Sequence, residues 1–147
     1  MRTNRILLSL AMVVLLGVAV TPGNAEEPYY PVGTVSIDMT SVAVGIGFSS
    51  GSGVLRYNGQ RYIFKIDGLS VGAVGIASIS AMGNVYNLSN VSQFAGSYAA
   101  AGAGIALSDG RAGLTLQNRA GVIINLYAVQ EGVELNIGPQ GFKITMQ

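Results

Sequence analysis

The amino-acid sequence predicts an all-β protein: a small antiparallel β-barrel of about nine or ten strands with one short helical turn. A β-sandwich is the second choice. From Gly33 to the C-terminus, bulky apolar residues alternate with small or polar ones, which is the two-residue period of a β-strand. Turn signals containing glycine separate these runs at intervals of about 8–12 residues. Because no long helical pattern lies between them, the strands have to close on themselves or stack to bury their apolar faces.

Glycine favours the closed alternative. It occupies 21 of the 147 positions, about twice its usual share of roughly 7%. Residues without a side chain allow the sharp bends that a closed sheet needs. The glycines expected inside strands are Gly45, Gly47, Gly72, Gly75, Gly102 and Gly104.

The first 25 residues have the pattern of a secretory signal peptide. Arg2 and Arg5 precede an uncharged apolar stretch over residues 6–20, and Ala25 ends a small-residue cleavage motif that two glutamates follow. The apolar stretch is shorter than the about 20 residues that a membrane-spanning helix needs. We therefore expect cleavage after Ala25, export, and no transmembrane segment in the mature chain.

Two further segments complete the expected domain organisation. Residues 26–32 are acidic and contain two prolines, so they are expected to form an extended lead-in. Residues 33–147 are expected to form the barrel as one domain.

Alternation predicts which side chains point into the barrel. Residues 42–48 should form one strand with a bulky face and a small face, and the last four apolar runs should form a meander of antiparallel hairpins. The residues expected on the inner face are Tyr62, Phe64, Ile66, Val122, Ile124, Leu126, Val133, Leu135, Ile137, Phe142 and Ile144.

Asn58-Gly59 is the strongest turn signal, because this pair accepts the positive backbone angles of a type I′ hairpin. It should join residues 54–57 to residues 60–66. The later turns are expected at Asp67-Gly68, Asp109-Gly110, Ala120-Gly121, Glu131-Gly132 and Gln140-Gly141.

One segment departs from the two-residue period. Leu88, Val91 and Phe94 are three residues apart, and Ser89 or Asn90 could cap a helix. We expect one or two helical turns here, ended by Gly96.

Composition excludes several classes of function. The chain has no His and no Cys, which removes disulfides, thiolate or imidazole metal sites, cysteine nucleophiles and Ser–His catalysis. Its formal net charge of +1 provides no concentrated basic face for nucleic acid. No window has the oxygen ligands of a calcium loop. We expect no catalytic residue, no metal and no cofactor, and the residues cannot identify a ligand.

Three residue groups remain open to a chemical interpretation. Ser52 could be a nucleophile if Lys65 or Lys143 served as its base, and a pair of carboxylates could support hydrolysis. Arg61 and Lys65 should share one strand face, where Arg56 could join them across the hairpin. This basic cluster is either a solvated outer face that discourages edge pairing or a docking point for phosphate groups of a lipid or envelope glycolipid.

Residues 62–72, 85–88 and 94–98 resemble the small exported barrels of Gram-negative bacteria typified by envelope-integrity protein A. Residues 51–54 (Gly-Ser-Gly-Val) and residues 94–98, which lead into the Ala/Gly-rich run, are also similar, more distantly, to SYLF domains. The resemblance covers roughly residues 33–147. It implies a periplasmic barrel with a role in envelope homeostasis, and lipid binding as in SYLF relatives. Those relatives contact membranes through a basic amphipathic N-terminal segment, whereas residues 26–32 are acidic and broken by proline.

These observations favour a non-enzymatic, periplasmic barrel that contributes to cell-envelope integrity and binds a lipid or another apolar ligand. Secretion is the alternative location. The alternative functions are a hydrolase with a Ser–Lys or carboxylate pair and a structural subunit of a surface assembly.

The cleavage site gives a direct prediction. The mature chain should start at Glu26, because Ala25 completes the small-residue motif after the apolar stretch. N-terminal sequencing of the exported protein checks this, and an intact Met1 would contradict it.

Overall fold

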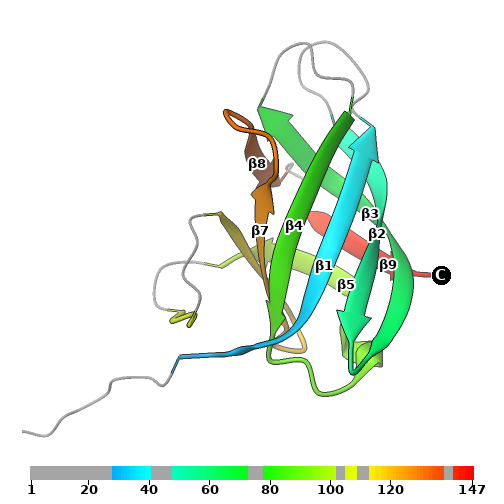
Figure 1. Ribbon diagram of the computed structural model, residues 1–147, viewed down its shortest axis with the longest axis vertical. Helices are drawn as coiled ribbons and strands as arrows, with labels where there is room; N and C mark the ends of the chain where they lie inside the picture. Colours follow the sequence, from blue (N-terminus) through cyan, green and yellow to red (C-terminus); the bar gives the residue numbers. More distant parts are fainter. Residues whose placement is uncertain (1–27, 41–47, 73–77, 102–104, 109–112, 138–140) are drawn as a thin grey trace, which may run out of the picture.

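The computed structural model describes residues 28–40, 48–72, 78–101, 105–108, 113–137 and 141–147 (Figure 1). Apart from one short 3₁₀ turn, the regular elements in these ranges are all strands. They are β1 (Pro31–Thr40), β2 (Phe48–Tyr57), β3 (Gln60–Gly72), β4 (Ser78–Tyr86), η2 (Val91–Gln93), β5 (Gly96–Ala100), β6 (Leu114–Asn118), β7 (Ile123–Ala128), β8 (Glu134–Ile137) and β9 (Phe142–Met146).

Eight of the strands close into an antiparallel barrel, which confirms the predicted fold class. Their order around the barrel is β2-β1-β4-β7-β6-β5-β9-β3, and pairing between β2 and β3 completes the ring. Strand β8 is an additional strand that pairs with the end of β3. Figure 1 shows the strands tilted around a common axis, as closure of a sheet requires.

The core fills the inside of the barrel. Along β1, for example, Val35, Ile37 and Met39 are buried and alternate with exposed residues. The predicted inner face is confirmed: its members either belong to the buried core or pack against it at the margin, as Tyr62, Val133, Leu135 and Ile137 do.

The hairpin at Asn58-Gly59 is also confirmed. Both residues have positive φ, +52° and +75°, as a type I′ turn requires. Tyr57 pairs with Gln60, so the loop contains two residues.

Asp67-Gly68 was expected to be a turn and is instead a bulge inside β3. The register with β2 shifts here, because Gly51 pairs with Ile66 while Ser49 pairs with Leu69. Gly68 has a φ of +93°, and a Cβ at this position would collide with the carbonyl oxygen of Gly141. A glycine at positive φ therefore bends a continuous strand here rather than reversing the chain.

The bulge also explains why the last four strands do not form the expected meander. Strands β6 and β7 form a hairpin, but β8 pairs with neither β7 nor β9. Instead, β9 and β8 lie one after the other along β3, on the two sides of Gly68. The 13-residue length of β3 provides room for both partners.

The remaining predicted turns divide into two groups. Ala120-Gly121 and Glu131-Gly132 lie in turns, and both glycines have positive φ. Asp109-Gly110, Gln140 and most of the expected strand over residues 42–48 lie outside the described residues.

The segment between β4 and β5 closes one end of the barrel. It contains the predicted helical turn, η2, capped by Asn90, whose side chain accepts a hydrogen bond from the Ser92 amide at 3.0 Å. The Tyr57 hydroxyl donates to the Leu88 carbonyl at 3.1 Å, and the side-chain amide of Asn118 donates to the Gln93 carbonyl at 2.7 Å.

A column of aromatic rings attaches this closing segment to the barrel wall. Phe94 packs edge-on against Phe64 of β3, with ring centroids 5.2 Å apart, and against Tyr98 of β5 at 6.4 Å. Tyr98 in turn packs against Phe142 of β9 at 5.9 Å, and its hydroxyl donates to the Phe94 carbonyl at 2.6 Å. The column therefore joins three strands and the closing segment.

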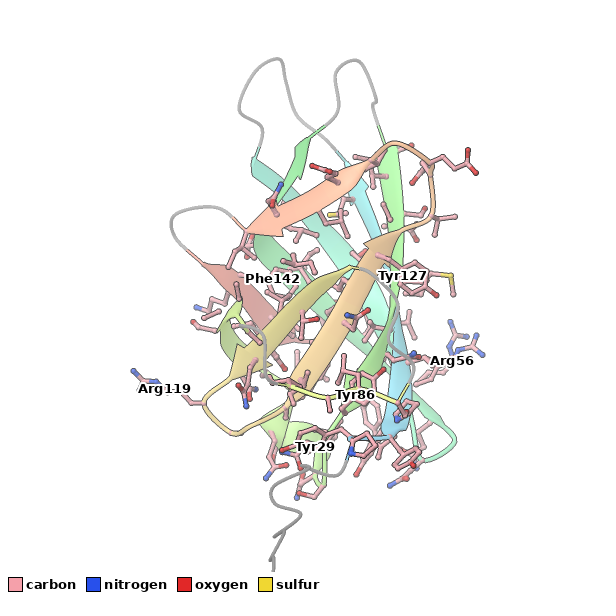
Figure 2. All side chains as sticks on the ribbon, turned by 90° about the vertical axis from the view of Figure 1, so that its left-hand side faces the viewer. Tyr29, Arg56, Tyr86, Arg119, Tyr127 and Phe142 are labelled. Carbon is pink, nitrogen blue, oxygen red and sulfur yellow. The ribbon has the colours of Figure 1, made fainter. Side chains whose placement is uncertain are left out.

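One outer face of the barrel is covered. Tyr86 and Ile123 lie on the outer side of their strands, because the adjacent residues of these strands belong to the core. Both are nevertheless fully buried. Residues 105–108 run across this face and are held to Tyr29 by two backbone hydrogen bonds, at 2.9 and 3.0 Å (Figure 2). The opposite outer face, formed by β1, β2 and β3, carries mostly exposed side chains.

Replacing Gly59 with Val should lower the free energy of unfolding by about 1–3 kcal/mol, because a β-branched residue would have to adopt positive φ. Apart from the two neighbouring residues in the chain, no atom lies within 4 Å of the added Cβ, so the expected loss comes from backbone strain. Urea unfolding measures the loss. Gly59→Asn is the control and should lose less, because Asn tolerates this conformation. Equal stability of Gly59→Val and the parent would show that the turn is misassigned.

Replacing Tyr98 with Phe should cost about 1–3 kcal/mol at pH 7, because the buried Phe94 carbonyl loses its donor. Burial also raises the pKa of the Tyr98 hydroxyl above its usual value, an effect that a hydrogen bond with Asn118 partly offsets. Above about pH 10 the unfolded chain loses this proton while the folded chain keeps it, so stability falls as pH rises.

Urea unfolding at pH 7 and at alkaline pH tests both effects. Tyr98→Phe should flatten the alkaline loss of stability. Tyr62→Phe is the control, since its hydroxyl makes an exposed hydrogen bond to Gln60. The account fails if the two variants have the same stability and the same pH dependence.

Candidate functional site

The basic cluster lies on the outer face of the β2–β3 hairpin. Strand register places Arg56 directly opposite Arg61, with both side chains exposed, so the predicted approach of Arg56 across the hairpin is confirmed. Lys65 lies four residues from Arg61 on the same face of β3. In the part of the chain that the structure describes, neither arginine forms an ion pair with a carboxylate. We call Arg56 and Arg61 the arginine pair.

A row of apolar side chains crosses the same face next to the arginine pair. Val54 pairs with Ile63, and Ser36 connects Val54 to Met82 on the far side of β1. Ile63 is 55% exposed and Met82 is 44% exposed, whereas Val54 is half-buried. Val54, Ile63 and Met82 form what we call the apolar row.

A shallow polar groove of about 470 Å³ lies on the other side of the apolar row. Asp38, Ser52 and Lys65 line it, together with Ser50 and Asp67. Asp38 accepts a hydrogen bond from the Ser80 hydroxyl at 2.8 Å. The outer face is thus basic near the hairpin turn, apolar in the middle and of mixed charge beyond.

The structure brings together one of the two Ser–Lys pairs considered from the sequence. Ser52 and Lys65 are cross-strand partners. Both are exposed, whereas a lysine that acts as a general base needs burial to favour its neutral amine. Lys143 lies elsewhere, opposite Asp67 on one side and Ser97 on the other.

The described carboxylates are distributed over two places. Asp38 and Asp67 line the polar groove, while Glu131 and Glu134 lie on the connection between β7 and β8 and at the start of β8. Among the described residues, no three acidic side chains gather in a way that could hold a metal ion.

Sequence reasoning found the arginine pair but missed the apolar row. The Asn58-Gly59 turn fixes the β2–β3 register, and this made the pairing of Arg56 with Arg61 predictable. Met82 joins the row only because β1 pairs with both β2 and β4, a long-range pairing that no local pattern specifies. Its exposure could have been inferred from the buried alternation of Ile79, Ala81 and Val85.

Comparisons with family models, curated proteins and solved structures return no match. No helix in the described ranges is both long and apolar enough to cross a membrane.

Proposed function

We propose that this chain is a non-enzymatic module of the bacterial cell envelope, and that it docks on anionic lipid through the outer face of β2 and β3. The arginine pair binds lipid phosphate, and the apolar row enters the region between headgroups and acyl chains. The signal peptide and the resemblance to envelope-integrity barrels support a periplasmic location.

The arginine pair is the observation that carries the proposal. Like charges placed directly opposite in an antiparallel ladder destabilise the sheet, and no described carboxylate is paired with either guanidinium. A phosphate between the two side chains would replace this repulsion by charge-assisted hydrogen bonds, for which guanidinium geometry is well suited. Binding of an anion would thus turn the repulsion between the two guanidinium groups into a favourable interaction.

The apolar row favours a membrane surface over a free phosphate ion. Ile63 follows Arg61 by two residues and points the same way, so both meet a flat surface together. An isolated phosphate would leave Ile63 and Met82 in water, whereas the boundary of a lipid layer accepts apolar side chains beside bound headgroups.

The filled interior also supports a surface mode of lipid binding. Phe64, Phe94 and Phe142 are fully buried inside the barrel, where a lumenal acyl chain would otherwise lie. This mode also fits the acidic lead-in, because contact through the hairpin does not require a basic N-terminal segment.

Co-sedimentation with phosphatidylglycerol vesicles tests the proposal. Each base near an anionic surface contributes about 1 kcal/mol, so Arg56→Gln or Arg61→Gln should weaken binding about fivefold. Binding of the parent should weaken as salt increases and should be minimal on phosphatidylcholine vesicles. Ile63→Ser should weaken binding while the dependence on salt remains.

Arg119→Gln is the matched control, since it removes the same charge from an exposed turn on the other side of the barrel from Arg56 (Figure 2). Its vesicle affinity should equal that of the parent. Equal affinity of Arg61→Gln and Arg119→Gln would contradict the proposed site. Equal binding of the parent to both kinds of vesicle would contradict docking on anionic lipid.

A further inference from the structure

A slot opens in the barrel wall between β7 and β8, away from the lipid-docking face. Its volume is about 510 Å³. Its lining comes from the start of β6, the end of β7 and the first part of β8. The lining includes Leu114, Leu126, Val133, Glu134 and Leu135.

The slot exists because two consecutive antiparallel strands do not pair. Strand β8 has β3 as its only ladder neighbour among the described strands. On the opposite wall, the ladder between β6 and β7 ends at the pair Leu114 and Leu126, so β7 continues beyond β6. The slot therefore lies between two strand edges that no described strand joins.

The floor of the slot is apolar and its rim is acidic. Leu126 is fully buried, and Leu114, Val133 and Leu135 are half-buried and pack against the core. Glu134 is exposed on β8, and Glu131 is exposed in the turn that leads to this strand. These two carboxylates are the charged side chains between the end of β7 and the end of β8.

We propose that the slot binds an extended peptide segment of a partner protein, which adds to β8 as a strand. The peptide alternates apolar residues, which contact the half-buried Leu114 and Leu135, with basic residues, which face Glu134 and the solvent. This binding function is separate from lipid docking and does not depend on it.

Strand edges favour a peptide over an acyl chain of similar size. Hydrocarbon in the slot would bury backbone amides and carbonyls of the edges without giving them partners, which is costly. An added strand provides donors and acceptors at the spacing of the ladder, and its alternate side chains meet the apolar floor. The acidic rim selects basic residues at the outward positions, by charge complementarity.

The short edge limits the length of the partner segment. Strand β8 has four residues, so the ladder accommodates about four residues of peptide at a rise of about 3.3 Å each. An edge this short with an exposed carboxylate discourages pairing with a second identical edge, and so favours a heterologous peptide over self-association.

Fluorescence polarisation with a labelled Lys-Val-Lys-Val-Lys-Val peptide tests the proposal on the exported protein. The parent should bind this peptide, and Glu134→Lys should weaken binding about tenfold. Asp67→Lys is the matched control, an exposed charge reversal on β3, and should leave affinity unchanged. Two control peptides carry N-methyl groups at the odd or at the even positions of the same sequence. The control that is methylated on the edge facing β8 cannot form the ladder and should not bind.

Hydrogen exchange locates the bound peptide independently of affinity. Amides of residues 134–137 should gain protection when the peptide binds, and those of residues 54–63 should not change.

Four results would overturn the proposal: no binding of the peptide, equal binding of the N-methylated forms, displacement by dodecyltrimethylammonium as an acyl-chain probe, or a concentration-dependent dimer that the peptide does not dissociate.

Discussion

The contact between Phe64 and Gly53 is the constraint on which the rest of the barrel depends. The two residues are cross-strand partners, and the ring lies over the glycine so closely that a Cβ on Gly53 would be 2.5 Å from its tip. From there, edge-on ring packing extends through Phe94 to Tyr98 and Phe142. A shift of one residue between β2 and β3 would turn Phe64 out of the core. The aromatic column therefore holds one register.

That register determines what the outer face presents. With Leu55 and Phe64 buried, the neighbouring Arg56 and Ile63 have to point outward, because successive strand residues alternate between faces. The tight turn at Asn58-Gly59 then leaves Arg56 and Arg61 opposite each other. The same packing that fills the interior thus creates a like-charge pair on the surface, and the β1 ladders extend the apolar row beside it to Met82.

Local patterns in the sequence predicted features that depend on neighbouring residues. The inner face of β3, the Asn58-Gly59 turn and the capped turn at Asn90 are of this kind. The pairing of β8 was not predictable, because β7 and β8 have the alternation and the glycine turn of an ordinary hairpin. The pairing is instead set by β3, whose bulge at Gly68 separates its partners β9 and β8. The place of Met82 in the apolar row and the existence of the slot both depend on such long-range pairings. These pairings cannot be read from the local sequence pattern.

A double-mutant cycle on Arg56 and Arg61 tests the central claim most directly, namely that the pair is repulsive alone and is relieved by an anion. Unfolding free energies of the parent, Arg56→Gln, Arg61→Gln and the double variant should show a destabilising coupling of about 0.2–1 kcal/mol at low salt. Glycerophosphate, compared with sodium chloride at equal ionic strength, should make the coupling favourable. A coupling of zero, or one that the two salts change equally, would contradict the account.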